Sequence, residues 1–336
     1  MPIGAKIKMP AKVEKRGHSG LYDEGDLPID PIINQNLNTM KHPYDPEIAK
    51  TKQHNARVFR ETTAIIRDGQ YTSPSGQRIG LDMQRMIDGG ECYHQELPRV
   101  EAPKVEGGTT VMVEVNDCLK AAERLVNEGY NPALLNFASA GYPGGGVTTG
   151  ARAQEETICR RSTLTRSIFS FDAGYASMFH YAHRAGNNYP LIRPLDFSAV
   201  YSPAVTVFRE AGPDYTLMEY PFQIGVITNA ALNFRSRYGF HLTDGHMPEQ
   251  AKTITRNKIR TIFRIGLMHG HDSLVLGAWG CGAFRNPPRE MAQLFKEVME
   301  KDEFKDRFRL ITFAIFSDHN DFNGNLRSFQ DVFKAY

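Results

Sequence analysis

Two glycine-rich stretches are the first residues of this chain whose types and spacing could carry chemistry. One covers residues 136–146 and ends in Gly144-Gly145-Gly146; the other covers residues 277–284. Glycines let backbone N–H groups approach an anion closely and form a concave nest, so a phosphate or diphosphate is a natural ligand. Tight turns without a ligand are the alternative explanation of either stretch.

Two adjacent glutamates, Glu155 and Glu156, follow the glycine triplet. Seven residues separate Gly146 from the sequence Gln154-Glu155-Glu156, at the expected start of a helix. Acidic residues there also suit the helix dipole, which would hold their pKa down. Beside a bound diphosphate, however, two carboxylates repel each other, so the pKa of one should rise. A carboxylic acid that keeps its proton near neutral pH can act as the general acid of glycosidic bond cleavage.

The elements that must position these residues alternate along the chain. We expect helices over 46–68, 117–127 (with Asn116 as N-cap), 153–167, 247–268, 288–300 and 326–334. We expect strands over 109–115, 132–137, 204–208, 222–228, 273–277 and 308–316. Alternating strands and helices predict parallel strand pairing and a sheet covered on both faces. Both glycine-rich stretches follow expected strands, so they should lie at the carboxyl edge of the sheet, where open α/β sheets bind ligands.

This combination resembles the bacterial-type poly(ADP-ribose) glycohydrolases, a branch of the macrodomain superfamily. The matching segments are LLNFASAGYPGGGVTTGARAQEETICRRSTL (134–164), YSPAVTVFR (201–209), LVLGAWGCGAFRNPP (274–288), FAIFSD (313–318) and, for the opening helix of that branch, ARVFRETTAIIRDGQY (56–71). The resemblance covers roughly residues 45–336. It implies an α/β fold, a macrodomain-like three-layer α/β/α arrangement with a mixed, largely parallel central sheet. It also implies hydrolysis of the ribose–ribose O-glycosidic bonds of poly(ADP-ribose), which releases ADP-ribose.

The resemblance also implies roles for individual residues. Glu156 matches the catalytic glutamate, which protonates the departing oxygen and then helps to activate water, and Glu155 matches its neighbour, which contacts the ribose. The other matching positions are expected to bind ADP-ribose or to support its binding; they are Asn136, Gly144, Gly145, Gly146, Gln154, Gly280, Cys281, Gly282, Ala283 and Phe284. For Phe284, a place in the hydrophobic core is the alternative.

One departure from the family pattern leaves the substrate open. Family members often carry a small residue where this chain has Arg285. A cation there could contact phosphates or change which acceptor fits, or it could point to solvent. Removal of a single ADP-ribose from a protein side chain is therefore an alternative activity. A catalytically silent ADP-ribose reader is a second alternative, which the presence of both glutamates disfavours.

Composition limits the partners and cofactors. The 336 residues carry a formal net charge of +2, which gives no reason to expect nucleic-acid or membrane binding. The four cysteines form no CxxC pair, and the histidine spacings at 180/183 and 269/271 lack a metal-site context, as does His319. We therefore expect no metal and no cofactor. The expected partners are ADP-ribose, poly(ADP-ribose) or ADP-ribosylated proteins.

The first 44 residues differ from the rest of the chain. Lysines and an arginine between Lys6 and Arg16 precede an acidic, proline-containing stretch, and periodic apolar residues are scarce. We expect a flexible extension over 1–44, for which a targeting segment is an alternative, and a catalytic domain over 45–336. We also expect an intracellular monomer.

Overall fold

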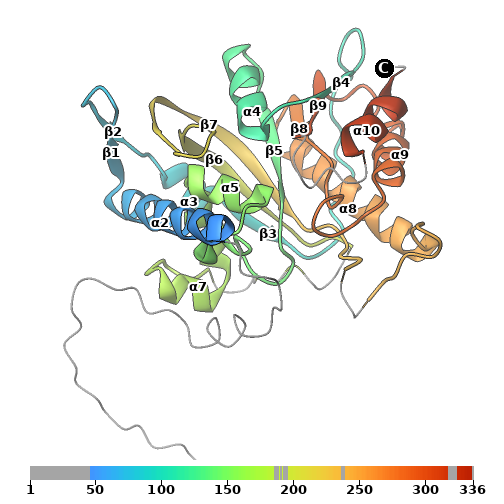
Figure 1. Ribbon diagram of the computed structural model, residues 1–336. Helices are drawn as coiled ribbons and strands as arrows, with labels where there is room; N and C mark the ends of the chain where they lie inside the picture. The colour runs from blue at the N-terminus through green and yellow to red at the C-terminus, as the bar shows by residue number, and fades with distance from the viewer. Residues whose placement is uncertain are drawn as a thin grey trace, which may run out of the picture. The chain divides into compact units, whose positions relative to one another are not determined.

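A computed structural model describes residues 46–184, 189, 191, 196–235, 239–316 and 324–334 (Figure 1). The proposed N-terminal extension, residues 1–44, lies outside these. Contacts between Cα atoms group Pro46–Tyr336 into one compact unit. None of the helices in the described ranges is long and apolar enough to cross a membrane.

A seven-stranded sheet forms the centre of this unit, with the strand order β3-β6-β7-β5-β8-β9-β4. Strands β7, β5, β8, β9 and β4 are parallel to one another, whereas β6 pairs antiparallel with both β7 and β3. The sheet is therefore mixed and largely parallel, as the resemblance implied. The strands are β3 (Glu91–Tyr93), β4 (Thr110–Glu114), β5 (Pro132–Phe137), β6 (Ala199–Arg209), β7 (Leu217–Asn229), β8 (Ser273–Leu276) and β9 (Leu310–Ala314).

Helices cover both faces of the sheet and enclose two hydrophobic cores. The apolar run of β5 is buried on both faces, because Leu134 packs into one core while Ala133 and Leu135 pack into the other. The first core lies under α4 (Cys118–Asn127), α5 (Gln154–Arg161) and α6 (Leu164–Ile168). The second lies under α8 (Glu249–Met268), α9 (Pro288–Met299) and α10 (Asn325–Phe333). This is a three-layer α/β/α arrangement.

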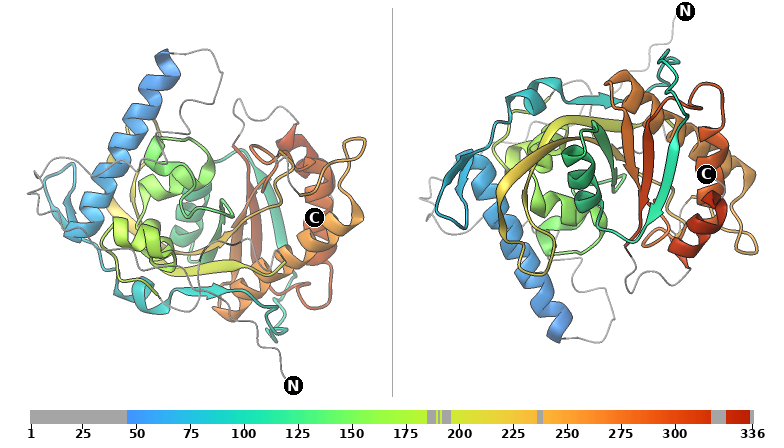
Figure 2. Two further views of the ribbon diagram at one scale, coloured as in Figure 1. Left: turned by 90° about the horizontal axis from the view of Figure 1, so that it is seen from below. Right: turned by 90° about the horizontal axis from the view of Figure 1, so that it is seen from above.

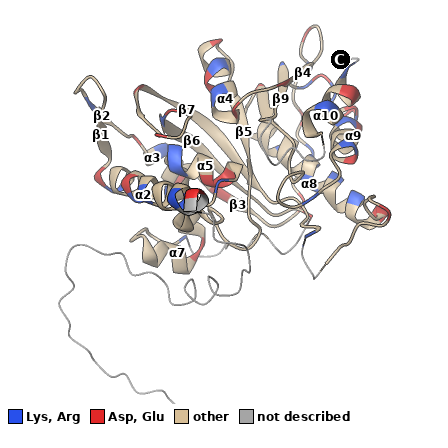
Figure 3. Cartoon of the chain, viewed as in Figure 1, with Lys and Arg blue, Asp and Glu red and all other residues tan. Residues whose placement is uncertain are grey.

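Further elements complete the unit. Figure 2 shows α2 (Pro46–Asp68) and α10 at opposite sides of the sheet. Lysines, arginines, aspartates and glutamates mix along α2, α4 and α9, so these helices show no single-sign face (Figure 3). The short elements are the antiparallel hairpin of β1 (Gln70–Thr72) and β2 (Arg78–Gly80), and α3 (Gln84–Gly89), η1 (Val147–Thr149), η2 (Phe169–Phe171) and α7 (Ala173–Met178).

Two expectations about local structure were wrong. Asp117, not Asn116, caps α4: its side chain accepts hydrogen bonds from the backbone N–H groups of Leu119 and Lys120, at 3.1 and 3.0 Å. The helix expected over 153–167 is interrupted, because Ser162 pairs with Val207 of β6 in an isolated bridge. Tertiary pairing there overrides helix propensity.

Two strands are longer than the sequence predicted, and a further helix and strand were not predicted. β6 and β7 extend beyond the expected 204–208 and 222–228, and neither α3 nor β3 was predicted. Residues 199–209 are buried throughout, so they show no alternation of polar and apolar residues that would mark the strand ends.

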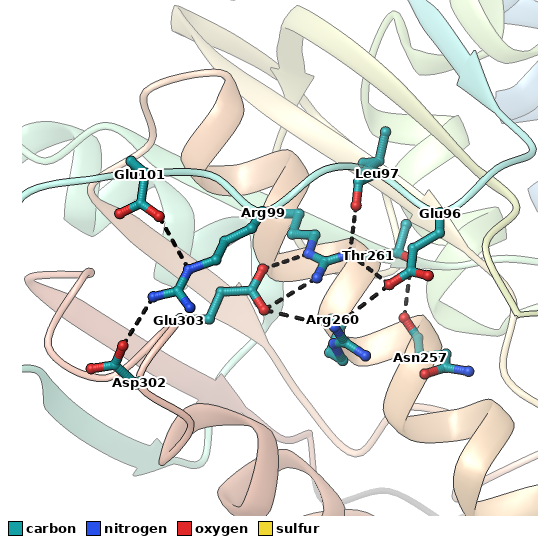
Figure 4. Close-up of polar contacts among 10 residues, drawn as sticks. Glu96, Leu97, Arg99, Glu101, Asn257, Arg260, Thr261, Asp302 and Glu303 are labelled. Carbon is teal, nitrogen blue, oxygen red and sulfur yellow. Dashed lines mark hydrogen bonds and ion pairs between the residues drawn. The ribbon is translucent and has the colours of Figure 1, made fainter.

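An ion-pair network holds the irregular segment 94–101 against α8 (Figure 4). Arg264 of α8 contacts Glu303 at 2.5 Å and Glu96 at 3.0 Å. Arg264 also donates a hydrogen bond to the carbonyl of Leu97. The guanidinium therefore supplies the donors that segment 94–101 requires in the absence of a strand partner.

Candidate active site

Two loops leave the carboxyl edge of the sheet from adjacent strands. Loop 1 (138–153) joins β5 to α5, and loop 2 (277–287) joins β8 to α9. β5 pairs in parallel with β8, so both loops begin at the same edge. The two glycine-rich stretches lie in these loops, at the position that the sequence predicted for a ligand crevice.

Glu155 is buried under loop 1 and its carboxylate is surrounded by donors. The residue is 2% exposed. One carboxylate oxygen accepts from the backbone N–H of Ser139 at 2.7 Å, and the other accepts from the N–H of Gly144 at 3.1 Å and from Nδ2 of Asn136 at 3.4 Å. Both oxygens are therefore engaged with the protein.

Glu156 has a different environment. The residue is 7% exposed, and Oε1 accepts from the backbone N–H of Gly146 at 2.8 Å. Oε2 is buried and has no hydrogen-bond partner within the described part of the chain. A buried carboxylate oxygen without a partner is unfavourable, so this atom lacks the hydrogen bond that a folded protein normally supplies.

The pair keeps a proton more strongly than ordinary carboxylates. Burial raises the pKa of Glu155 to about 8, the neighbouring Glu156 carboxylate acts in the same direction, and the hydrogen bonds from Ser139, Asn136 and Gly144 oppose the rise. This agrees with the expectation that one carboxyl of the pair holds a proton near neutral pH.

Gly145 brings loop 1 against both carboxylates. Its φ of +56° lies in the left-handed region, and a Cβ at this position would lie 2.5 Å from Oε1 of Glu156 and 3.1 Å from Oε2 of Glu155. No side chain fits there without displacing the pair. The glycine triplet thus serves the approach of loop 1 to the glutamates, in addition to the ligand approach that the sequence indicated.

The structure places Asn136 beside Glu155 and brings in two polar residues that sequence reasoning missed, Thr228 and Asn229. Nδ2 of Asn136 donates to Oγ1 of Thr228 at 3.2 Å as well as to Glu155, and Oδ1 has no partner among the described residues. Next to Thr228, the fully buried Asn229 ends β7, and neither polar atom of its amide has a described partner. The signal was the position of both residues at the end of a strand that neighbours β5.

Gln154, which precedes Glu155 in the sequence, connects the start of α5 to the end of β5. Its Oε1 accepts from the N–H of Phe137 at 2.8 Å, and its Nε2 donates to the carbonyl of Leu135 at 2.8 Å. The amide thereby ties the start of α5 to the end of β5. The structure supports an indirect, supporting role for Gln154, one of the two roles that the resemblance allowed, because its amide is occupied by the backbone of β5.

Loop 2 is packed tightly against the chain around Gly280 and has open space around Gly282. At Gly280, with a φ of +75°, a Cβ would lie 2.5 Å from Cβ of Ala231, whereas a Cβ at Gly282 would meet nothing within 4 Å. Ala283 is exposed. The indole of Trp279 donates to the carbonyl of Asn229 at 3.1 Å, which joins loop 2 to the end of β7.

Three further residues of loop 2 differ in their burial. Cys281 is 1% exposed, and burial raises the pKa of its thiol, so it lacks the character of a nucleophile. Phe284 is half-buried and packs against the hydrophobic core beneath loop 2. Arg285 is exposed and has a φ of +57°, a conformation that favours glycine.

Helix α2 forms the wall next to loop 1. Nδ2 of Asn55 donates to the carbonyl of Gly150 at 3.2 Å, and a Cβ at Gly150 would collide with the backbone of Lys52. An open pocket of about 580 Å³ lies beside this contact. It is lined from α2, the end of loop 1, the β6–β7 turn and the end of β9, including Lys50, His54, Arg152, Tyr215 and Phe316.

The histidines are placed away from any metal-like cluster. Nε2 of His269 lies 2.9 Å from the hydroxyl of Tyr93, and Nε2 of His271 lies 2.8 Å from the hydroxyl of Tyr201. Across the described ranges, no group of three or more His, Cys, Asp or Glu side chains is arranged to hold a metal ion. His319 falls outside those ranges.

Comparison with known proteins identifies the family. The sequence model of the microbial-type PARG catalytic domain matches residues 59–210. A search of curated protein sequences found no match. The poly(ADP-ribose) glycohydrolase of Thermomonospora curvata bound to the inhibitor ADP-HPD is 30% identical, and the alignment covers 82% of this chain and 98% of that one with a TM-score of 0.65.

A second bacterial enzyme gives a similar result. The poly(ADP-ribose) glycohydrolase of Deinococcus radiodurans in complex with ADP-ribose is 29% identical, with 76% of this chain and 97% of that one covered and a TM-score of 0.57. The family-model match, residues 59–210, contains loop 1 and α5. The chain therefore belongs to the microbial-type poly(ADP-ribose) glycohydrolases.

Proposed function

We propose that this chain hydrolyses the ribose–ribose bonds of poly(ADP-ribose) with Glu156 as the general acid and base. The unpartnered Oε2 of Glu156 is the observation that carries this assignment. A general acid must present its proton to the substrate, and both oxygens of Glu155 are already engaged by donors of the protein. Of the two carboxyl groups, Glu156 is therefore the one with an oxygen that is not already engaged by a described residue.

The reaction follows from this geometry. Glu156 donates a proton to the departing ribose oxygen while the glycosidic bond breaks, and positive charge develops on the terminal ribose. The carboxylate that results accepts a proton from water as the water oxygen bonds to the anomeric carbon. The products are ADP-ribose and a chain shortened by one unit, and Glu156 ends protonated as it began.

Binding of the ADP-ribose unit is assigned to the two loops. Backbone N–H groups around Gly282 are suited to a diphosphate, whereas those of Gly144, Gly145 and Gly146 already donate to Glu155, Tyr142 and Glu156. Oδ1 of Asn136, which has no partner among the described residues, is suited to accept from a ribose hydroxyl. Relatives that carry ADP-ribose or an ADP-ribose analogue support this assignment. Glu155, which holds Ser139, Gly144 and Asn136 together, orients the binding groups.

Substitution of Glu156 by glutamine tests the assignment. Glu156→Gln keeps the side-chain shape and loses the transferable proton, so turnover of poly(ADP-ribose) should fall by about 10²–10⁴-fold, the usual worth of general acid–base catalysis. The affinity for ADP-ribose, measured by calorimetry, should change little. Glu155→Gln should lower both turnover and affinity, because an amide cannot accept from all three donors. Near-normal turnover by Glu156→Gln would require another acid.

A further inference from the structure

A small pocket lined by two arginines lies outside both loops. It has a volume of about 80 Å³ and is formed by α3, α6, η2 and residues 182–184. Arg166, Ala182, His183 and Arg184 line it, together with two side chains of α3 and two serines. It shares no residue with loop 1 or loop 2, so it is separate from the candidate active site.

No carboxylate of the described residues pairs with the arginines of this pocket. The guanidinium of Arg166 lies over the ring of Tyr181, 4.7 Å from its centroid, and has neither a hydrogen-bond acceptor nor an ion-pair partner among the described residues. Arg184 lies over Phe171 and donates to the carbonyl of Gly90, a neutral acceptor. Burial lowers the pKa of Arg166, and the charge of Arg184 contributes to the lowering, so the two cations are close enough to repel each other.

Three other buried arginines of the chain each contact a carboxylate, whereas the buried Arg160 contacts none among the described residues, donates to the carbonyl of Ala151 and lies over the ring of Tyr215. Arg161 contacts Asp117 at 2.8 Å, Arg209 contacts Glu61 at 3.5 Å and Arg264 contacts Glu303 at 2.5 Å. Two neighbouring, partly buried guanidiniums without a carboxylate are unfavourable by themselves. This arrangement favours an anion that comes from outside the described residues.

We propose that the Arg166–Arg184 pocket binds a phosphate group. The planar donor fork of arginine matches phosphate oxygens, and a volume of about 80 Å³ suits a single tetrahedral oxyanion rather than a nucleoside. The phosphate comes either from inorganic phosphate or from an ADP-ribose unit that lies outside the catalytic crevice. Both sources present the same group to the two guanidiniums.

Ala182 allows the pocket to be filled from within the chain. Ala182 is exposed and lines the pocket, so Ala182→Glu places a carboxylate beside the two arginines. This variant should have a higher Tm than the natural chain in phosphate-free buffer, because it supplies the missing counter-charge. Ala182→Gln, of nearly the same shape but neutral, is the matched control and should leave the Tm unchanged.

Phosphate binding is measured on the full chain with ADP-ribose at saturating concentration, which fills the catalytic crevice. Calorimetric titration with inorganic phosphate should show one remaining site. Its affinity should fall at least about tenfold in Ala182→Glu and in Arg166→Gln, the loss expected for charge-assisted hydrogen bonds, and should persist in Ala182→Gln. Arg327→Gln, which removes an exposed arginine on α10, should have no effect.

A kinetic arm distinguishes the second source. If the phosphate belongs to the polymer, Arg166→Gln should raise the KM for long poly(ADP-ribose) severalfold without changing kcat or the KM for the shortest chains. This arm rests on the proposed glycohydrolase activity, whereas the phosphate titration does not. The proposal is overturned if inorganic phosphate fails to bind and long-chain KM is unchanged, or if phosphate binds equally to Ala182→Glu and the natural chain. If Arg166→Gln does not fold, Ala182→Glu and Ala182→Gln test the proposal by the same phosphate titration and the same KM measurement on long chains.

Discussion

The chain buries carboxylates in two regions by opposite means. The Glu155–Glu156 pair accepts hydrogen bonds from backbone N–H groups of loop 1, and no ion pair to either glutamate exists within the described ranges. Glu303, whose side chain is 10% exposed, lies instead between Arg264 and Arg260 (Figure 4). Both regions bury acidic side chains to a similar degree, but only the second supplies opposite charges.

The difference separates chemistry from stability. A carboxylate next to guanidiniums is stabilised as an anion and has no reason to take up a proton near neutral pH. Among backbone donors Glu155 keeps a proton because burial raises its pKa, and Oε2 of Glu156 is left without a partner in the described part of the chain. Buried carboxyl groups without opposite charges destabilise the fold, and they persist where a reaction uses them.

Gly145→Ala should break the first region most severely. The added Cβ would lie 2.5 Å from Oε1 of Glu156 and would have a left-handed φ, so loop 1 and the carboxylates must move apart. A misplacement of this kind costs about 10²-fold in rate. Gly141→Ala in the same loop, where a Cβ meets nothing within 4 Å, is the control for steady-state turnover. Equal activity of the two variants would contradict the close approach of Gly145.

Glu303→Gln should break the second region without affecting catalysis. It leaves Arg264, which is 5% exposed, without its closest carboxylate. Loss of one partner of a buried pair costs about 3–5 kcal/mol of unfolding free energy when the other charge is left uncompensated. Because Glu96 still contacts Arg264 at 3.0 Å, the loss should lie below that range and above about 1 kcal/mol. Chemical denaturation measures this loss, and turnover per folded molecule should not change. Glu297→Gln removes the exposed partner of Arg256 and should cost less than about 1 kcal/mol. Equal losses would show that the Arg264 network acts as a surface network.

The raised pKa of Glu155 should make the free energy of unfolding depend on pH. Its pKa rises from 4.5 in the unfolded chain to about 8 in the folded one, so the folded state binds the proton more tightly and stability falls as pH rises across this interval. Burial lowers the pKa of His271 from 6.5 to about 4, so stability also falls as pH drops below 6.5.

Between pH 6.5 and 8, the pH dependence of stability therefore comes from Glu155 and not from His271. There the free energy of unfolding should decrease by up to about 1.4 kcal/mol per pH unit. Denaturation of Glu155→Gln over the same range should show a smaller slope. An equal slope in the variant would mean that the retained proton is not on the carboxyl pair.

Substitutions of Arg285 should have the smallest effect on stability and test the backbone conformation of loop 2. Because its φ is +57°, Arg285→Gly should be about 1 kcal/mol more stable than Arg285→Ala, although both variants lack the charge. Thermal unfolding compares the two. Their ADP-ribose affinities, measured against the natural chain, show whether the guanidinium contacts the ligand; a stability order of Ala above Gly would contradict the left-handed backbone.

The sequence by itself determined the main elements and the location of the site. Uniform burial of β5, the glycine triplet and the spacing to Glu155-Glu156 are local patterns, and hydrophobic periodicity and loop glycines are readable without neighbours. For the same reason the extended ends of β6 and β7 were missed, since pairing across the sheet, not local propensity, sets their length.

Only the tertiary structure decided what each polar group does. Which glutamate keeps a free oxygen depends on donors from residues 136–146, and the partners of Asn136 include Thr228, 92 residues away. Arg264 and Glu303 are 39 residues apart, and Arg166 and Arg184 meet only through the folding of α6 against residues 182–184. Burial and hydrogen bonding fix the charge of these groups, and both depend on distant segments that no local pattern specifies.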